Sequence, residues 1–265
     1  YLLGEVWEDG TTKVAYSKRR RYLLGGGLHG LMNYPFRTAL LPYLAGTSGA
    51  EDFRDAMETI RENYPSPTFY GAMNFLSTHD TPRLLTLLGC EQPPADRDAR
   101  AHYRLSPAER ERGTALLKLA ALVLYAFPGS PTVYYGDEAG MEGFEDPFNR
   151  RTYPWGAEDR EILAFYRRLC EIHADSDTLA HGELRFDTGE NDALLRYERT
   201  TEHSRLVVLV NRSRQEVKTN VNALKAPRST CRGQRRSRTT RSAVNRFWSK
   251  AVGCISPSPP TTLCC

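Results

Sequence analysis

Two patterns of apolar residues alternate along the first 178 residues, one with helical spacing and one made of short continuous runs. The most regular helix is predicted over residues 51–64. Four apolar side chains recur there on one face, namely Phe53, Met57, Ile60 and Tyr64. A longer helix is predicted from Ser106 to about Phe127, because Ser106 and Glu109 form a capping box and Pro107 takes the first helical position.

Short apolar runs that end in polar residues alternate with these helices, as in a parallel α/β fold. They predict strands over residues 1–7, 28–34, 71–77 and 132–135. Further helices are predicted over residues 36–44, 84–88 and 158–174, with loops over residues 91–104 and 139–156. Because ligands bind at the carboxyl ends of parallel strands, the polar residues that follow these runs are the candidate functional residues.

The pattern changes near Leu179, where helical spacing disappears. Strands are predicted over residues 184–186, 193–198 and 206–211, which indicates a small antiparallel β domain. From Ala226 onward neither period remains. We expect residues 226–265 to be a disordered or aberrant basic tail, such as a shifted reading frame would encode.

Composition narrows the classes of function. Eight of the 36 basic residues and none of the 32 acidic ones lie in residues 226–265, so residues 1–225 carry a net charge of −4. A mildly acidic body gives no reason to expect a nucleic-acid partner. No apolar run reaches the roughly 18 residues of a membrane span. Only Cys90 and Cys170 precede the tail, which favours a reducing, cytoplasmic compartment. Because Tyr1 stands inside a predicted strand, the sequence leaves open whether a signal peptide precedes it.

The densest chemistry lies in residues 75–83, Phe-Leu-Ser-Thr-His-Asp-Thr-Pro-Arg, where a predicted buried strand ends in His79 and Asp80. An imidazole beside a carboxylate at a strand end can hydrogen-bond a polar ligand and stabilise a developing positive charge. A turn with a satisfied His–Asp pair would show the same residues. Glu5, at the end of the first run, is likewise a candidate functional carboxylate.

Five segments together resemble the α-amylase family of glycoside hydrolases, in particular its neopullulanase, cyclomaltodextrinase and maltogenic amylase branch. Gly-Glu-Val-Trp at residues 4–7 resembles the family's fifth-strand segment, and Leu-Met-Asn-Tyr-Pro-Phe-Arg at residues 31–37 its sixth. Residues 75–83 resemble the seventh, residues 129–138 the eighth, and residues 146–155 the loop that follows.

The resemblance implies an α/β chain with three parts. Residues 1–178 would form the C-terminal half of the catalytic (β/α)₈ TIM barrel, strands five to eight. Residues 179–225 would begin a truncated antiparallel β-sandwich domain, and residues 226–265 would be the aberrant tail. A complete barrel needs eight strands, so we expect this chain to be a fragment of its parent enzyme.

The resemblance also implies roles for six residues. Glu5 would be the acid/base and Asp80 a second catalytic carboxylate that binds sugar hydroxyls. Substrate-binding roles fall to His79, Trp7, Asp146 and Arg150. Core packing for Trp7 and a loop-stabilising salt bridge between Asp146 and Arg150 are the alternatives, and structural roles are expected for Arg83, Asp137 and Glu138.

The implied activity is that of a retaining glycoside hydrolase that cleaves α-1,4 glucosidic bonds. Cleavage of α-1,6 bonds stays open, and so does the choice among maltooligosaccharides, cyclodextrins, pullulan and starch as the substrate. The family's nucleophile Asp, on the fourth strand, has no counterpart in residues 1–265, so the isolated chain is expected to be inactive. No cofactor and no metal ligands are expected, while a calcium requirement and homodimerisation of the parent enzyme stay open.

Two other functions compete. A non-catalytic relative could use the same scaffold for carbohydrate binding or assembly, although such a protein has no need of Glu5. Nucleic-acid binding through the basic tail is disfavoured, because the tail lacks a periodic or aromatic-interleaved pattern.

Overall fold

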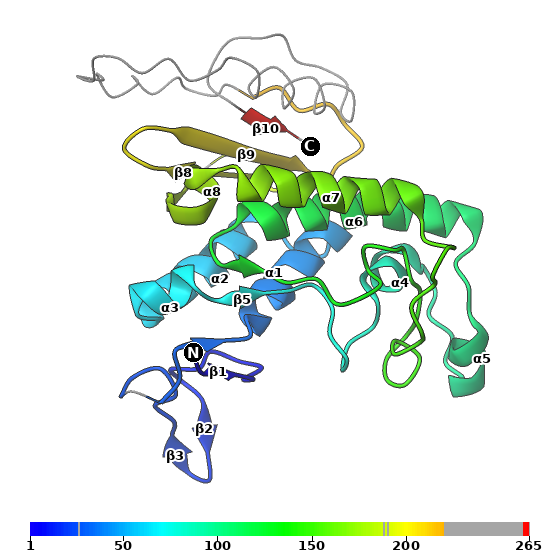
Figure 1. Ribbon diagram of the computed structural model, residues 1–265, viewed down its shortest axis with the longest axis horizontal. Helices are drawn as coiled ribbons and strands as arrows, with labels where there is room; N and C mark the ends of the chain where they lie inside the picture. The colour runs from blue at the N-terminus through cyan, green and yellow to red at the C-terminus, as the bar shows by residue number, and fades with distance from the viewer. Residues whose placement is uncertain (26, 188, 190, 220–261, 265) are drawn as a thin grey trace.

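The first part of the molecule contains four short parallel strands, of which Figure 1 labels β1, near the N-terminus, and β5. They are β1 (Leu3–Gly4), β4 (Gly30–Leu31), β5 (Met73–Asn74) and β6 (Ser130–Pro131). β1 pairs with β4 and β5 with β6, and a parallel bridge between Met32 and Met73 joins the two pairs in the order β1-β4-β5-β6. The computed structural model describes residues 1–25, 27–187, 189, 191–219 and 262–264.

Helices cover this array, as a parallel sheet requires. Between β4 and β5 lie α1 (Tyr34–Ala45), α2 (Ala50–Asn63) and α3 (Ser66–Tyr70). Between β5 and β6 lie α4 (Leu84–Gly89), α5 (Arg97–His102) and α6 (Pro107–Ala126), and α7 (Arg160–Ala174) and α8 (Asp177–His181) follow. A hairpin of β2 (Val14–Ala15) and β3 (Lys18–Arg19) lies between β1 and β4.

The predicted amphipathic helices are confirmed with small changes in their ends. Ser106 caps α6 as expected: its hydroxyl accepts from the Glu109 amide, and the Glu109 carboxylate accepts from the Ser106 amide. The loop predicted over residues 91–104 was wrong in part, because α5 lies inside it. Asp96 starts that helix by accepting a hydrogen bond from the Ala99 amide at 2.7 Å.

The strand predicted over residues 132–135 was wrong, because β6 lies earlier. Gly129 turns the chain with a φ of +124°, and the amides of Ser130 and Thr132 then donate to Ala72 and Asn74 of the neighbouring strand. Pro131, which has no N–H, falls between these two donors, where the ladder does not need one.

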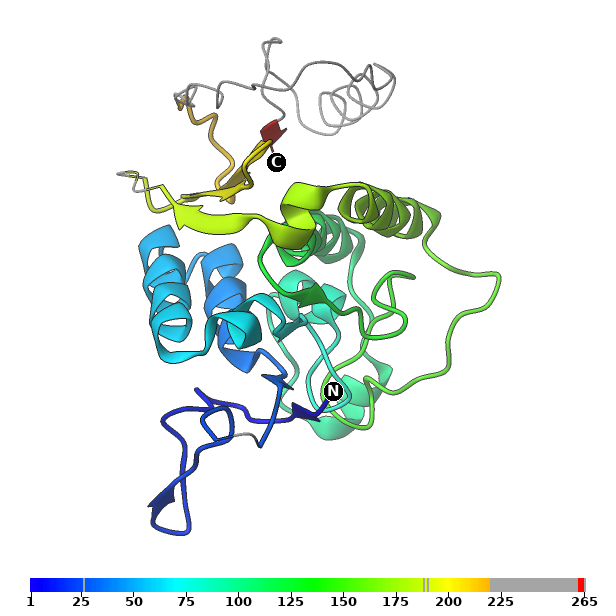
Figure 2. The ribbon, with the colours of Figure 1, turned by 60° about the vertical axis from the view of Figure 1, so that its left-hand side comes forward.

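A second sheet lies at the end of the molecule opposite the β2–β3 hairpin (Figure 2). It contains β7 (Glu183–Phe186), β8 (Leu194–Thr200) and β9 (Arg205–Asn211), all antiparallel, and β10 (Thr262–Cys264), which is parallel to β9. The three predicted strands are confirmed, but β10 was not predicted. The remainder of the predicted tail, residues 226–261 and 265, lies outside the described residues.

A shared aromatic core joins this sheet to the helices. Phe127, just after α6, lies 5.2 Å from Phe36 and 5.7 Å from Phe53, measured between ring centroids. On its other side it meets Tyr197 of β8 at 5.8 Å. These rings are almost completely buried, so the second sheet and the helices share one hydrophobic core. Among the described residues, no helix is both long and apolar enough to cross a membrane.

Candidate active site

Glu5, His79 and Asp80 converge at the carboxyl end of the four-stranded array. Glu5 directly follows β1, while His79 and Asp80 follow β5 after a short extended segment. One ligand atom from each of the three side chains lies within 4.8 Å of the other two. Residues 74 positions apart in the sequence are therefore neighbours, because β4 alone separates β1 from β5.

Tyr34 links Glu5 to the aromatic residues of the site. Its phenol donates a 2.7 Å hydrogen bond to Glu5 Oε1, and burial, followed by that hydrogen bond, raises the pKa of Tyr34. The phenol therefore stays protonated and holds the carboxylate in one orientation. Trp7 stacks on the Tyr34 ring, with 4.2 Å between centroids and 18° between planes. Trp7 remains 50% exposed, so part of its surface is open to a ligand.

The two oxygens of Asp80 face different partners. Oδ2 lies 3.3 Å from His79 Nε2, and Oδ1 lies 3.2 Å from an Arg150 guanidinium nitrogen. Arg150 Nε also lies 2.9 Å from Asp146 Oδ1. The sequence-predicted residues are thus brought together, and the salt bridge between Asp146 and Arg150 is present alongside the contact with Asp80.

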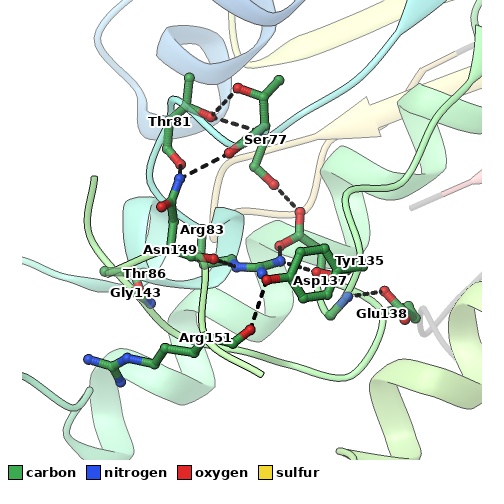
Figure 3. Close-up of polar contacts among 12 residues, drawn as sticks. Ser77, Thr81, Arg83, Thr86, Tyr135, Asp137, Glu138, Gly143, Asn149 and Arg151 are labelled. Atoms are coloured by element: carbon green, nitrogen blue, oxygen red, sulfur yellow. Dashed lines mark hydrogen bonds and ion pairs between the residues drawn. The ribbon is translucent and has the colours of Figure 1, made fainter. Parts of the chain in front are cut away.

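A network of polar contacts around Arg83 and Asn149 lies next to these exposed residues in the chain, and Figure 3 shows how it joins Thr81, Asp137 and Tyr135. The Asn149 side-chain amide donates to the backbone carbonyls of Thr78, His79 and Thr81 at 3.1, 2.8 and 2.8 Å. Arg83, which is 0% exposed, donates from Nε to the Asn149 carbonyl at 2.8 Å. These contacts connect the loop after β5 to the loop after β6.

Arg83 is the centre of a buried polar network. Its guanidinium donates to the Tyr135 carbonyl and lies 3.4 Å from Asp137 Oδ1. The rings of Tyr134 and Tyr135 lie 4.2 and 4.5 Å from the guanidinium carbon. Such contacts are those expected of a structural role, which is the role the sequence predicts for Arg83 and Asp137.

Burial raises the pKa of Asp137 to about 6, although hydrogen bonding from Ser77 and the charge of Arg83 act in the opposite direction. The Ser77 hydroxyl donates to Asp137 Oδ2, so both carboxylate oxygens are engaged. Near neutral pH the Asp137 carboxylate is ionised, and its burial then lowers the stability of the folded protein.

Sequence reasoning missed Tyr34 and Asn149 as site residues. Tyr34 follows β4, so the rule that polar residues after a strand are candidates could have selected it. No local signal selects Asn149, which lies in a loop and acts on a segment about 70 residues earlier.

Glu5, His79 and Asp80 are also the group of described residues that could together hold a metal ion. One imidazole and two carboxylates would suit a transition metal better than Ca²⁺, which takes six to eight oxygen ligands. Asp80 already has a guanidinium and an imidazole as neighbours, an arrangement that equally suits a polar, uncharged ligand.

A family model and several known proteins match this chain. The family model described as the alpha amylase catalytic domain matches residues 1–198. The amylopullulanase of Thermoanaerobacter thermohydrosulfuricus is 34% identical over 194 residues, 69% of this chain and 12% of its own length. The maltogenic alpha-amylase of Bacillus acidopullulyticus is 30% identical over 223 residues, 82% of this chain and 33% of its own length.

A solved cyclomaltodextrinase structure superposes with a TM-score of 0.62 at 30% sequence identity. The match covers 80% of this chain and 32% of that chain. The chain therefore spans about a third or less of the length of these relatives.

Replacing Asp137 with Asn should change how stability depends on pH. Because the folded-state pKa of about 6 lies above the unfolded value of 3.8, the native protein loses stability as pH rises from about 4 to 6. The loss is on the order of 3 kcal/mol and levels off above about pH 7. Asp137→Asn should remove this slope, as measured by guanidinium unfolding at several pH values. Parallel profiles for the two proteins would show that Asp137 does not titrate in this range.

Proposed function

The chain belongs to the α-amylase family, and from this premise we propose that it carries the acid/base side of a retaining glycoside hydrolase site that acts on α-1,4 glucosidic bonds. The observation that carries the proposal is the convergence of Glu5, His79 and Asp80 within 4.8 Å. The relatives named amylopullulanase, maltogenic alpha-amylase and cyclomaltodextrinase support an α-glucan as the substrate class.

Glu5 is the proposed general acid. It would give its proton to the glycosidic oxygen as the bond to the anomeric carbon breaks, while a nucleophilic carboxylate attacks that carbon from the other side. Water then attacks the covalent intermediate and gives its proton to Glu5, which restores both carboxyl groups. The hydrogen bond from Tyr34 would keep Glu5 oriented through both steps.

Asp80 and His79 are proposed to hold the sugar at the cleavage site. Both side chains are exposed and can accept from or donate to sugar hydroxyls. The negative charge of Asp80 would also stabilise the oxocarbenium-like transition state. Asp146 and Arg150 would bind the neighbouring sugar on the non-reducing side, and Trp7 would stack against one on the leaving-group side.

We further propose that the four parallel strands correspond to strands five to eight of the family's barrel, and that the second sheet begins a β-sandwich. The order β1-β4-β5-β6 and the helices on its outside support this assignment. The nucleophile would then come from the fourth strand, which has no counterpart in residues 1–265.

Replacing Glu5 with Gln in a protein that contains this chain and the nucleophile should lower turnover of maltooligosaccharides by several orders of magnitude, because the general acid is lost. Asp80→Asn should act similarly. Turnover is measured from released reducing sugar, with circular dichroism to check folding. Near-normal turnover of a folded Glu5→Gln protein would contradict the proposal and favour a non-catalytic relative.

Trp7→Ala should weaken the reaction of long substrates more than that of the shortest one, because it removes a stacking surface on the leaving-group side. The expected loss is on the order of 1 kcal/mol, or about fivefold in kcat/KM. Rates are compared across maltooligosaccharides of increasing length. An equal loss at all lengths would instead assign Trp7 to packing against Tyr34.

The 265-residue chain by itself should not hydrolyse starch, because Glu5 and Asp80 lack a nucleophilic carboxylate. Purified chain is incubated with starch and with maltooligosaccharides, and Glu5→Gln chain serves as the control for contaminating hydrolases. The prediction would be refuted if the unmodified chain hydrolysed starch and the Glu5→Gln chain did not.

A further inference from the structure

We propose that Asn149 is a positioning residue for His79 and Asp80, and that Arg83 holds Asn149 in place. The expected effect on catalysis rests on the proposed function, whereas the role of Asn149 in ordering the loop at residues 78–83 does not. It assigns a role to a loop residue that is itself completely buried.

Three backbone carbonyls converge on the Asn149 side chain. Its amide nitrogen lies within hydrogen-bond distance of the carbonyl oxygens of Thr78, His79 and Thr81, which share its two hydrogens, and the residue is completely buried. Three carbonyls from four consecutive residues can point to one nitrogen only when the loop takes a single tight conformation. That conformation sets the direction in which the His79 and Asp80 side chains leave the backbone.

The anchor on the other side is Arg83. Its Nε donates to the Asn149 carbonyl at 2.8 Å, so Asn149 is held by its backbone while its side chain holds the loop after β5. The Arg83 amide donates to the Gly143 carbonyl at 2.9 Å, which ties the end of that loop to the chain that leads to Asn149. The same guanidinium contacts Asp137, so its charge is compensated inside the protein.

Arg150 follows Asn149 directly in the chain, so the position of Asn149 also influences the ion pair between Arg150 and Asp80. Arg150 Nε donates to the His79 carbonyl at 3.0 Å, and its guanidinium meets Asp80 at 3.2 Å. Asn149 therefore positions both the carboxylate and the cation beside it. Without this anchor, exposed side chains that pair only weakly would not keep one arrangement.

The Asn149 side chain makes its hydrogen bonds through its nitrogen. Its side-chain oxygen has no hydrogen-bond partner among the described residues. Asn149→Asp keeps the size and shape of the side chain but replaces the donors with a carboxylate that faces three carbonyls. Asn149→Ser keeps one donor, so its effect should be intermediate.

Tyr43→Phe is the matched control. The Tyr43 hydroxyl is also a buried hub, which accepts from the Leu195 amide at 3.0 Å and donates to the Val210 carbonyl at 2.6 Å. Tyr43 belongs to α1, and its hydroxyl connects that helix to the second sheet, away from the residues of the site. Its loss should lower global stability without a change at residues 78–83.

Hydrogen exchange tests the structural part on the 265-residue chain. In Asn149→Asp, the amides of Thr81 and Arg83 should exchange at least tenfold faster, while those of α6 stay unchanged. Tyr43→Phe should leave the exchange at residues 78–83 unaltered, and Asn149→Ser should fall between. Equal loop exchange in Asn149→Asp and the unmodified chain would overturn the inference, whatever the activity.

Kinetics tests the consequence in a protein that also contains the nucleophile. Asn149→Asp should lower kcat by about 10²-fold, as expected of a misplaced catalytic group, with KM for a long maltooligosaccharide within threefold. Tyr43→Phe should change neither constant. If Glu5→Gln abolishes turnover but Asn149→Asp behaves like Tyr43→Phe, the positioning role is wrong. If Glu5→Gln retains turnover, the proposed function fails, and the exchange measurement still decides the structural role.

Discussion

A positive charge buried at Arg83 constrains much of this structure. A guanidinium with no exposure to water needs acceptors and a counter-charge close by. Asp137, the carbonyls of Tyr135 and Asn149, and two tyrosine rings supply them, and all lie in the segment after β6. The segment after β5 and the segment after β6 must therefore meet around this charge.

The exposed site depends on that buried contact. Asp80, His79 and Arg150 are each more than a third exposed, and pairs of this kind contribute little stability alone. Their geometry comes from the backbone beneath them, which Asn149 and Arg83 hold. Glu5 is supported separately, since Tyr34 is buried between Trp7 and Phe75 and directs its hydroxyl at the carboxylate. Rigid buried groups thus place flexible, solvent-facing ones, as preorganised sites require.

Strand order explains why residues from distant segments form one site. Parallel strands have their carboxyl ends at the same edge of a sheet. Because only β4 lies between β1 and β5, Glu5 after β1 and Asp80 after β5 are close together. The aromatic core around Phe127 fixes the helices behind this edge and carries the second sheet.

Local pattern by itself determined α2 through its regular apolar face, α6 through its capping box, and β8 and β9 through short apolar runs between polar turns, because these signals lie within a few residues of one another. Short motifs likewise selected Glu5, His79 and Asp80 as candidate site residues, and the structure places these three side chains together. The tertiary structure alone decided the position of β6, the hydrogen bond from Tyr34 to Glu5, and the hold of Asn149 on the His79 loop. The two hydrogen bonds join segments 29 and 70 residues apart, and β6 is set by its pairing with another strand. A pattern of nearest neighbours carries no information about such contacts.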